Sequence, residues 1–294
     1  PLEREIIEVQ KQTETLGYWQ DAWLRLKKNK MATLGLAIIL ILILTAIFVP
    51  IFSSHTYDEQ NLMMPNQSPS FEHWFGTDNL GRDIFIRVLY GARISLAIGI
   101  VASLINFFIG VIYGGISGFF GGKVDRIMMN IVDILYSIPT LLYVILLMVV
   151  LKPGLTNIFI ALGIGYWLQM ARIVRGQILA LKQQEFVLAA RSIGASKTRI
   201  LLRHLIPNTM GAIVVTMTLA IPDAIFTEAF LSFIGLGVSA PMASWGVLAS
   251  EGINNIRAYP FQLFFPAAAI SITMLAFNFL GDGLRDVLDP KMRR

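Results

Sequence analysis

Residues 94–122 read ISLAIGIVASLINFFIGVIYGGISGFFGG and contain no charged side chain. A helix of about 20 apolar residues is long enough to cross the hydrocarbon core of a bilayer. Backbone amides in lipid have no water to bind, so a run of this length must be helical. We therefore place a membrane-spanning helix over 94–119.

The same criterion predicts further spans at 33–52, 127–151, 154–171, 209–231 and 258–281. The expected fold class is all-α: a polytopic membrane protein with six transmembrane helices. The 33–52 run follows a basic segment, as the apolar part of a signal peptide does, but it is longer than that part and no small-residue cleavage site follows it. We expect it to be retained. The sequence starts at Pro1 and not at Met, so we expect that it was trimmed.

Composition excludes several kinds of site. Hydrophobic residues make up 55% of the 294 residues and charged residues only 15%, against roughly 25% charged in soluble domains. The absence of cysteine excludes disulfides, thiolate metal ligands and a cysteine nucleophile. His55, His73 and His204 lie far apart in the sequence, so we expect no metal centre. The 24 basic and 19 acidic residues are not the basic footprint of a nucleic-acid-binding protein.

Lysine and arginine divide unequally between the two sides of the predicted membrane. In membrane proteins, the cytoplasmic loops between spans carry an excess of these residues. Most Lys and Arg residues lie on one side, in the segments 1–32, 120–126, 172–208 and 282–294. The connections on the other side contain only Arg82, Arg87, Arg93, Lys152 and Arg257. This predicts a multi-pass membrane protein with both termini, 1–32 and 282–294, in the cytoplasm. An external loop is expected at 53–93 and a five-helix core at 94–281.

Small residues recur at every fourth position of the second span. They are Gly91, Ser95, Gly99 and Ser103, then Gly110, Gly114, Gly118 and Gly122. Residues four apart share one helix face, and small side chains let helices approach closely in lipid. The stripe predicts a helix buried among neighbours, either in fixed packing or as a surface that slides during transport.

Acidic residues inside the predicted spans are Asp133, Asp223 and Glu228. A charge within the membrane is costly and usually faces protein or a water-filled cavity. We expect Asp133 to be paired structurally. Asp223 and Glu228 either line a pathway or form structural hydrogen bonds. Their spacing places them roughly 140° apart around a helix, so they cannot face the same way, and we assign Asp223 to a cavity.

Residues 185–208 read EFVLAARSIGASKTRILLRHLIPN, which is too polar for a span and too apolar for a free linker. Apolar residues at helical spacing predict a first helix that ends at Gly194. A second helix fits 196–206, ended by Pro207. Such a helix–turn–helix either docks a partner protein or rests on anionic lipid.

This segment resembles the EAA loop of ABC importer permeases, with matches at Ala189, Ala190, Gly194, Leu205, Ile206 and Pro207. Leu188 stands where that pattern has Glu, and the nearest acid is Glu185. Four further segments resemble signatures of dipeptide, oligopeptide and nickel permeases. They are FGTDNLGRD at 75–83, FTEAFLSFIGLG at 226–237, SWG at 244–246 and NFLGDGLRDVLDP at 278–290. The resemblance covers residues 20–294 and is nearest to the C-type subunit of oligopeptide permeases.

The resemblance implies a bacterial inner-membrane protein with a type I ABC importer permease fold, which forms half of the pathway of an ATP-driven peptide importer. The implied partners are a paralogous permease subunit, two cytosolic ATPases and an extracytoplasmic peptide-binding protein, besides the bilayer. The 185–207 loop is then expected to couple to the ATPases through Glu185, Ala189, Ala190, Arg191, Gly194, Ala195, Arg199 and Pro207. In the external loop, Asp78, Arg82 and Asp83 either pin the loop and cap the next helix or contact the binding protein.

The sequence contains no G-x-x-x-x-G-K-[ST] phosphate loop, since Gly122-Lys123 is followed by Val124. We therefore expect no enzyme activity and no cofactor in this chain, with ATP and Mg in the partner ATPases. One alternative is a permease of the same family for dipeptides or nickel chelates. Another is an ion-driven secondary transporter, which predicts coupling acids at the midplane and broken helices in corresponding halves.

Overall fold

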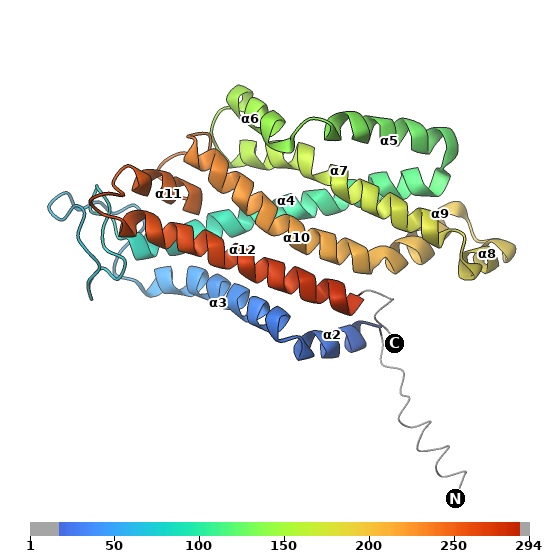
Figure 1. The fold of residues 1–294 in the computed structure, drawn as a ribbon, viewed down its shortest axis with the longest axis horizontal. Coiled ribbons are helices and arrows are strands. Elements are labelled where there is room, and N and C mark those ends of the chain that lie inside the picture. Colours follow the sequence, from blue (N-terminus) through green and yellow to red (C-terminus); the bar gives the residue numbers. More distant parts are fainter. Residues whose placement is uncertain (1–17, 289–294) are drawn as a thin grey trace, which may run out of the picture.

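The computed structural model describes residues 18–288, which form an elongated bundle of helices (Figure 1). The helices are α2 (Tyr18–Lys28), α3 (Lys30–Phe52), α4 (Ile84–Phe120), α5 (Gly122–Tyr136), α6 (Thr140–Leu151), α7 (Leu155–Leu181), α8 (Glu185–Ser192), α9 (Lys197–Arg199), the π-helical turn η1 (Ile200–Leu205), α10 (Ile206–Phe233), α11 (Trp245–Ile253) and α12 (Phe261–Leu288). The described residues form no β-strand beyond one isolated bridge between Thr77 and Asp83. The all-α prediction is confirmed.

Five helical stretches are long and apolar enough to cross a membrane: α3, α4, α7, the continuous helix 197–233 and α12. A sixth crossing exists only if α5 and α6 count as one span, because the two helices are bent by 78°. The prediction of a single helix over 127–151 is therefore wrong. Pro139 has no N–H to donate and disfavours helical geometry in the residue before it, so the helix breaks between Tyr136 and Thr140.

Two helices are longer than the uncharged runs that predicted them. α4 begins at Ile84, so the expected loop 53–93 is helical from that residue on, and α7 continues past residue 171 to Leu181. The charged residues in these extensions have partners: Arg93 Nε donates to the Ala46 carbonyl at 2.6 Å, and Arg172 Nη2 lies 2.5 Å from Asp133 Oδ1. Because these charges are paired, the two helices continue past their uncharged runs. A search for uncharged segments alone does not predict these extensions. It also gives Asp133 the structural partner expected for it.

The small-residue stripe of α4 packs against backbone and side chains of its neighbours. A Cβ atom added at Gly110 would lie 2.5 Å from Met170 Cβ, and one at Gly118 would lie 2.9 Å from the Arg175 carbonyl oxygen. At Gly114 it would overlap the carbonyl oxygen of Ala171. These positions bring α4 into direct backbone contact with α7. Gly99 plays the same part against α10, where an added Cβ would lie 2.9 Å from Ile221 and Ile225 side-chain atoms.

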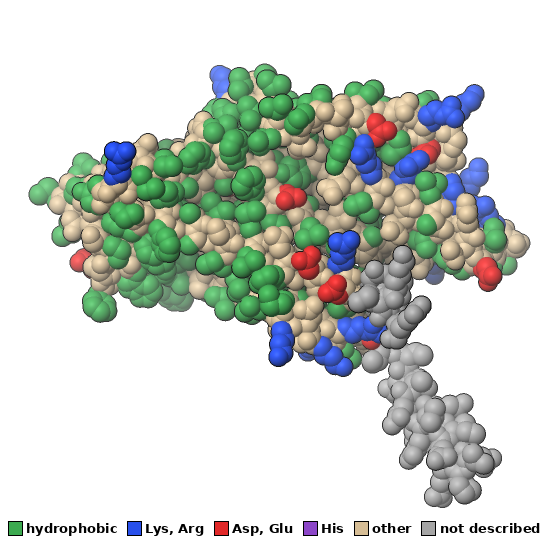
Figure 2. Space-filling view, viewed as in Figure 1, with side chains coloured by type: hydrophobic (Ala, Val, Ile, Leu, Met, Phe, Trp, Pro, Cys, Tyr) green, Lys and Arg blue, Asp and Glu red, His purple; other side chains and the backbone are tan. Residues whose placement is uncertain are grey.

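The two ends of the bundle differ in kind (Figures 1 and 2). The 53–83 loop and α11 lie at one end, and α2, α8 and α9 lie at the other, where most Lys and Arg side chains of the visible face gather. Hydrophobic side chains cover much of the surface between them. Large exposed apolar residues of α3 and α6 include Ile41, Leu44, Ile51, Leu146, Val149 and Val150. Such a band is the surface that lipid or a second membrane subunit covers.

Replacing Gly114 by Ala should destabilise the folded protein, because the added methyl group has no space against the Ala171 carbonyl. We expect a loss of about 1–3 kcal/mol, as for other overpacked cores, read as a lower melting temperature of the purified protein. Gly115→Ala is the matched control, because its Cβ would meet only side-chain methyl groups at 3.8 and 3.9 Å. Equal melting temperatures for the two variants would contradict this account of the α4–α7 contact.

Candidate functional site

A cavity of about 440 Å³ lies beside the break between α5 and α6. Residues from α4, α5, α6, α7 and α10 line it, together with the break itself. Its polar and aromatic lining comprises Asn106, Tyr136, Thr140, Tyr166, Gln169, Asp223 and Thr227. An amide, hydroxyl and carboxylate lining at the depth of the apolar helices is what a hydrophilic solute would require.

Asp223 is the charged residue of this lining, and its side chain is exposed. Its carboxylate has no hydrogen-bond or ion-pair partner among residues 18–288. Its backbone carbonyl instead accepts a hydrogen bond from the Tyr166 hydroxyl at 3.0 Å, and that hydroxyl is also 2.6 Å from Thr227 Oγ1. The Tyr166 contact fixes α7 against α10 next to Pro222, where proline removes a backbone hydrogen bond.

Asn106 adds a second unpaired group to the cavity. Its side chain is 2% exposed, and its Oδ1 atom finds no hydrogen-bond donor in the described part of the chain. A buried polar atom without a partner costs free energy. The cavity therefore presents one free carboxylate, that of Asp223, while the unpaired Asn106 oxygen is buried behind the cavity surface.

Glu228 has quite different surroundings from Asp223, as the helical spacing predicts. It is fully buried. Ser95 Oγ of α4 donates to Glu228 Oε2 at 3.0 Å, and Ser232 Oγ donates to Oε1 at 2.7 Å. Ser95 Oγ also accepts the backbone N–H of Trp245 at 3.3 Å. Glu228 thus joins α4, α10 and the start of α11, and it does not line the cavity.

The 53–83 loop is fixed by a set of charges that includes the buried residues Asp78 and Arg82. Arg82 Nε and Arg87 Nη1 lie 2.7 and 2.6 Å from Asp78 Oδ2. Arg87 Nη1 is also 2.6 Å from Glu251 Oε2 of α11. The Arg87 side chain is 2% exposed, so its charge depends on these two carboxylates. The arrangement ties the loop to α4 and α11.

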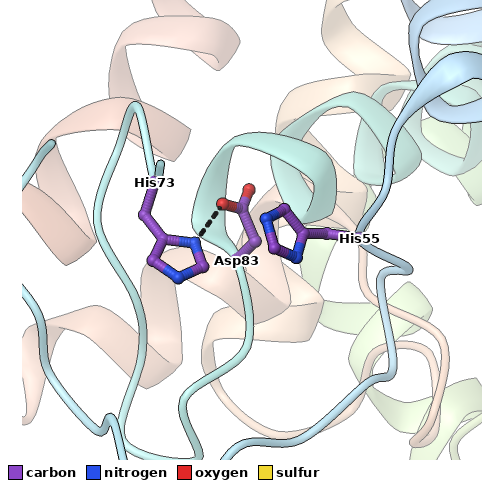
Figure 3. A group of neighbouring side chains, drawn as sticks. All are labelled: His55, His73 and Asp83. Carbon is purple, nitrogen blue, oxygen red and sulfur yellow. Dashed lines mark hydrogen bonds and ion pairs between the residues drawn. The ribbon is translucent and has the colours of Figure 1, made fainter. Parts of the chain in front are cut away.

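Asp83 has a separate role at the start of α4. Its Oδ1 accepts the Ile86 backbone N–H at 2.8 Å, which makes it the N-cap. Its Oδ2 accepts the Nδ1–H of the His73 ring at 2.8 Å. The ring of His73 lies 4.9 Å from that of His55 (Figure 3). Distance along the sequence does not predict this pair, because the loop folds back on itself.

The 185–207 segment begins with α8, a short helix attached to the end of the bundle. Val187 and Ala190 are buried, whereas Phe186, Leu188 and Ile193 are 40%, 50% and 85% exposed. The apolar residues at helical spacing that predict this helix are Phe186, Ala189, Ala190 and Ile193, and of these only Ala190 is buried. The buried Val187 lies outside that set. The remaining expected contact residues lie on the outside, with Glu185, Ala189, Arg191, Gly194 and Arg199 exposed and Ala195 half-buried.

Gly194 ends α8 with a positive φ of 81°. Its N–H donates to the Arg191 carbonyl at 3.0 Å, and the Ala195 N–H donates to the Ala190 carbonyl at 3.0 Å. A residue in this left-handed conformation after a helix is usually glycine, as the sequence predicts. Ser196 then caps the next helix by accepting the Arg199 N–H at 3.3 Å.

The prediction that Pro207 ends the second helix is wrong. The chain is helical without interruption from Lys197 to Phe233. The wider η1 turn precedes Pro207, and the Ile206 N–H donates to the Leu201 carbonyl, five residues back. A proline ring normally clashes with the carbonyl four residues earlier, and a π turn changes that spacing. Pro207 is then the second residue of α10 and lies within the continuous helix, directly after the wider turn.

Sequence reasoning missed Arg87, Glu251 and Gln262 as site residues. Gln262 Nε2 of α12 donates to Asn66 Oδ1 at 2.8 Å and to the Thr77 carbonyl at 3.1 Å, which anchors the same loop. A signal was present for the charged pair. Arg87 is an arginine beside a long apolar run, and Glu251 is the only acid in 232–281, so the two are natural partners.

Comparison with protein families gives two matches. Residues 106–294 match the family described as binding-protein-dependent transport system inner membrane component. Residues 17–69 match the N-terminal transmembrane domain of oligopeptide transport permease C. Together the two matches contain α3, the part of α4 from Asn106 on, and all the residues that line the cavity.

Individual relatives extend over almost the whole chain. The oligopeptide transport system permease protein OppC of Bacillus subtilis is 58% identical over 96% of this chain and 92% of its own length. The dipeptide transport system permease protein DppC of the same organism is 57% identical over 95% of this chain and 88% of its own. OppC of Escherichia coli K12 is 44% identical, with 96% and 94% covered.

Replacing Arg87 by Ala should strongly destabilise the protein, because Asp78 would keep its burial and lose its closest counter-charge. Removing one partner of a buried ion pair costs about 3–5 kcal/mol. We expect a fall in melting temperature and in the yield of folded protein. Arg257→Ala is the control, since Arg257 is an exposed residue in the connection before α12. Unchanged melting of the Arg87 variant would show that the charge set does not hold the loop.

Proposed function

We propose how this chain works from one premise: it belongs to the family of binding-protein-dependent transport system inner membrane components. It is a transmembrane permease subunit of an ABC importer, and the substrate that we assign to it is a peptide. The relatives named for oligopeptide and dipeptide transport support that class. In this proposal the chain forms half of the pathway, and hydrolysis of ATP takes place in partner subunits.

The cavity has the chemistry that a peptide needs along its way. A peptide carries N–H donors, carbonyl acceptors and a terminal ammonium group whatever its side chains are. The exposed Gln169 amide in the lining can donate to a carbonyl group and accept an N–H group, and the free carboxylate of Asp223 can bind an ammonium group. Because these contacts address the main chain, the lining tolerates many peptide sequences.

A second, paralogous permease subunit is proposed to close the other side of this cavity. The cavity of this chain is open, and Asp223 and Phe226, both exposed, lie on its α10 wall. A carboxylate turned toward hydrocarbon would be expensive, whereas one turned toward a shared, water-filled pathway keeps its hydration. The surface beside Asp223 is therefore assigned to the subunit interface.

One observation carries the coupling proposal, namely the way α8 is attached. Two small buried side chains, Val187 and Ala190, hold it on the bundle, while Phe186, Leu188 and Ile193 leave an apolar surface uncovered. Arg191, Lys197 and Arg199 surround that surface with positive charge. An apolar centre with a charged rim is the composition of a protein interface, and we assign it to a cytosolic ATPase.

This assignment fixes the proposed orientation. The end of the bundle that carries α2 and α8 lies in the cytoplasm with both termini, as the distribution of Lys and Arg predicts. The 53–83 loop and α11 then face the outside, where a peptide-binding protein would dock and release its peptide. An ion-driven mechanism with inverted repeats would require broken helices in both halves, and α5–α6 is the one bent pair in the described part of the chain.

The experiment that tests the proposal is transport by the reconstituted complex. The chain is co-expressed with its paralogous permease and ATPase subunits, placed in lipid vesicles and supplied with binding protein and a labelled peptide. We expect peptide uptake that requires ATP and is unaffected by collapsing ion gradients. Uptake by this chain alone, driven by a proton gradient, would contradict it.

Replacing Gly194 by Val should uncouple ATP hydrolysis from peptide uptake, or release the ATPases, while the protein stays in the membrane. A β-branched residue cannot adopt the positive φ of 81° without strain, so α8 would change its orientation. Gly194→Asn is the matched control, because asparagine tolerates the left-handed conformation and should retain most of the uptake. Normal uptake by the valine variant would remove this turn from the coupling mechanism.

Cysteine substitution should distinguish the surroundings of the two acids of α10. The chain has no native cysteine, so a single cysteine at 223 or 228 is the only target in this subunit. We expect water-soluble thiol reagents to label Asp223→Cys in at least one nucleotide state and to leave Glu228→Cys unlabelled, because Glu228 is fully buried. Labelling at 228 with none at 223 in any nucleotide state would refute the assignment of Asp223 to the pathway.

A further inference from the structure

Three potential metal ligands meet where the external loop joins the bundle (Figure 3). His55 follows the end of α3, His73 belongs to the middle of the loop, and Asp83 is the N-cap of α4. One ligand atom from each lies within 4.8 Å of the others. His73 Nδ1 and Asp83 Oδ2 are 2.8 Å apart, and the two imidazole rings are tilted by 37° at 4.9 Å.

We propose that His55, His73 and Asp83 bind a divalent transition-metal ion, which we assign as Zn²⁺. Two imidazole nitrogens and one carboxylate form a set of three protein ligands that zinc commonly takes, with a fourth position left open. Calcium and magnesium prefer oxygen ligands, so the imidazoles favour zinc over them. The proposal concerns a resident ion, independent of the peptide pathway.

The geometry needs a small closure to hold the ion. Zinc–ligand bonds of 2.0–2.1 Å place tetrahedral ligands roughly 3.3 Å apart. The His73–Asp83 pair must separate slightly, because the metal takes the position of their shared proton and the His73 proton then resides on Nε2. His55 must approach by roughly 1–1.5 Å to reach a bond of that length. Its side chain is half-buried and makes no hydrogen bond within the described residues, so nothing opposes that movement.

The other two ligands are already held in place. The His73 backbone N–H donates to Ser70 Oγ at 3.1 Å, and its carbonyl accepts from the Ser70 and Gly76 N–H groups at 2.8 and 2.9 Å. Asp83 Oδ1 keeps the cap bond to Ile86 while Oδ2 is free to bind the metal. Pre-positioned ligands reduce the ordering that binding must pay for.

Solvent and a fourth ligand reach the site through an adjoining cavity of about 400 Å³. His55, Glu72 and Asp83 are among its lining residues, and Glu72 is exposed. Either water or the Glu72 carboxylate completes the tetrahedron. Once bound, the ion links the end of α3 to the start of α4. Arg93 makes the neighbouring link between these helices through its hydrogen bond to the Ala46 carbonyl.

Zinc content measures the site directly. The full transporter complex is purified through a tag without histidine, equilibrated with micromolar Zn²⁺, and its bound zinc is counted by mass spectrometry. We expect one zinc per copy of this chain in addition to any in the partner subunits, and a zinc-dependent rise in melting temperature. His55→Ala should lose that one zinc and the rise, and it should otherwise fold normally because its side chain makes no hydrogen bond.

Two further variants complete the test. Asp83→Asn retains a good N-cap but removes the charge, and should raise the zinc dissociation constant at least about tenfold, as loss of a group near a metal does. His204→Ala, at the opposite end of the bundle in η1, should change nothing. Equal zinc content and equal zinc-dependent melting in the wild-type and His55→Ala complexes would overturn the proposal, as would an equal loss in the His204 variant.

Discussion

The close approach of α4 to α7 is the contact on which the rest of the structure depends. With no Cβ at Gly110, Gly114 and Gly118, the backbone of α4 reaches the backbone of α7 over about two turns. Lipid supplies no hydrophobic force between apolar helices, so close van der Waals packing has to hold them together. Asn106 of α4 and Tyr166 of α7 face one cavity because this contact sets the distance between their helices. The same contact positions the end of α7, from which α8 begins four residues later.

Several charged residues within the described helices are paired with opposite charges. Arg87 lies between Asp78 and Glu251, and Arg175 forms two hydrogen bonds to Asp125, at 2.5 and 2.6 Å. A guanidinium group and a carboxylate have matching geometry, so each pair offsets the cost of removing its charges from water. The consequence is that helices extend beyond the uncharged segments, and the functional loops at both ends are attached to rigid elements.

The sequence predicts the architecture well and predicts local exceptions poorly, for a physical reason. Long apolar runs locate five crossings because the bilayer imposes length and polarity on each of them separately. Proline shows the limit: Pro139 ends a helix, whereas Pro207 lies within a continuous one because the η1 turn changes the spacing before it. That turn depends on packing of Ile200 and Leu205 into the bundle. The His55–His73 contact likewise forms only when the loop folds back on itself, so the spacing of the two residues in the sequence does not predict it.

Two helices, α7 and the continuous helix from Lys197 to Phe233, connect the proposed coupling surface to the proposed pathway. α7 carries Tyr166 and Gln169 and leads into α8, and the continuous helix from Lys197 leads from the Gly194 turn to Asp223. A helix transmits displacement along its axis better than a loop does, since each residue is fixed by backbone hydrogen bonds. Movement of α8 by an ATPase would therefore reach the cavity along both of its walls. Pro222 interrupts that hydrogen bonding directly before Asp223, so bending is easiest where the carboxylate meets the cavity. In the proposed cycle, access to the pathway changes at this position because the rigid part of the helix ends there.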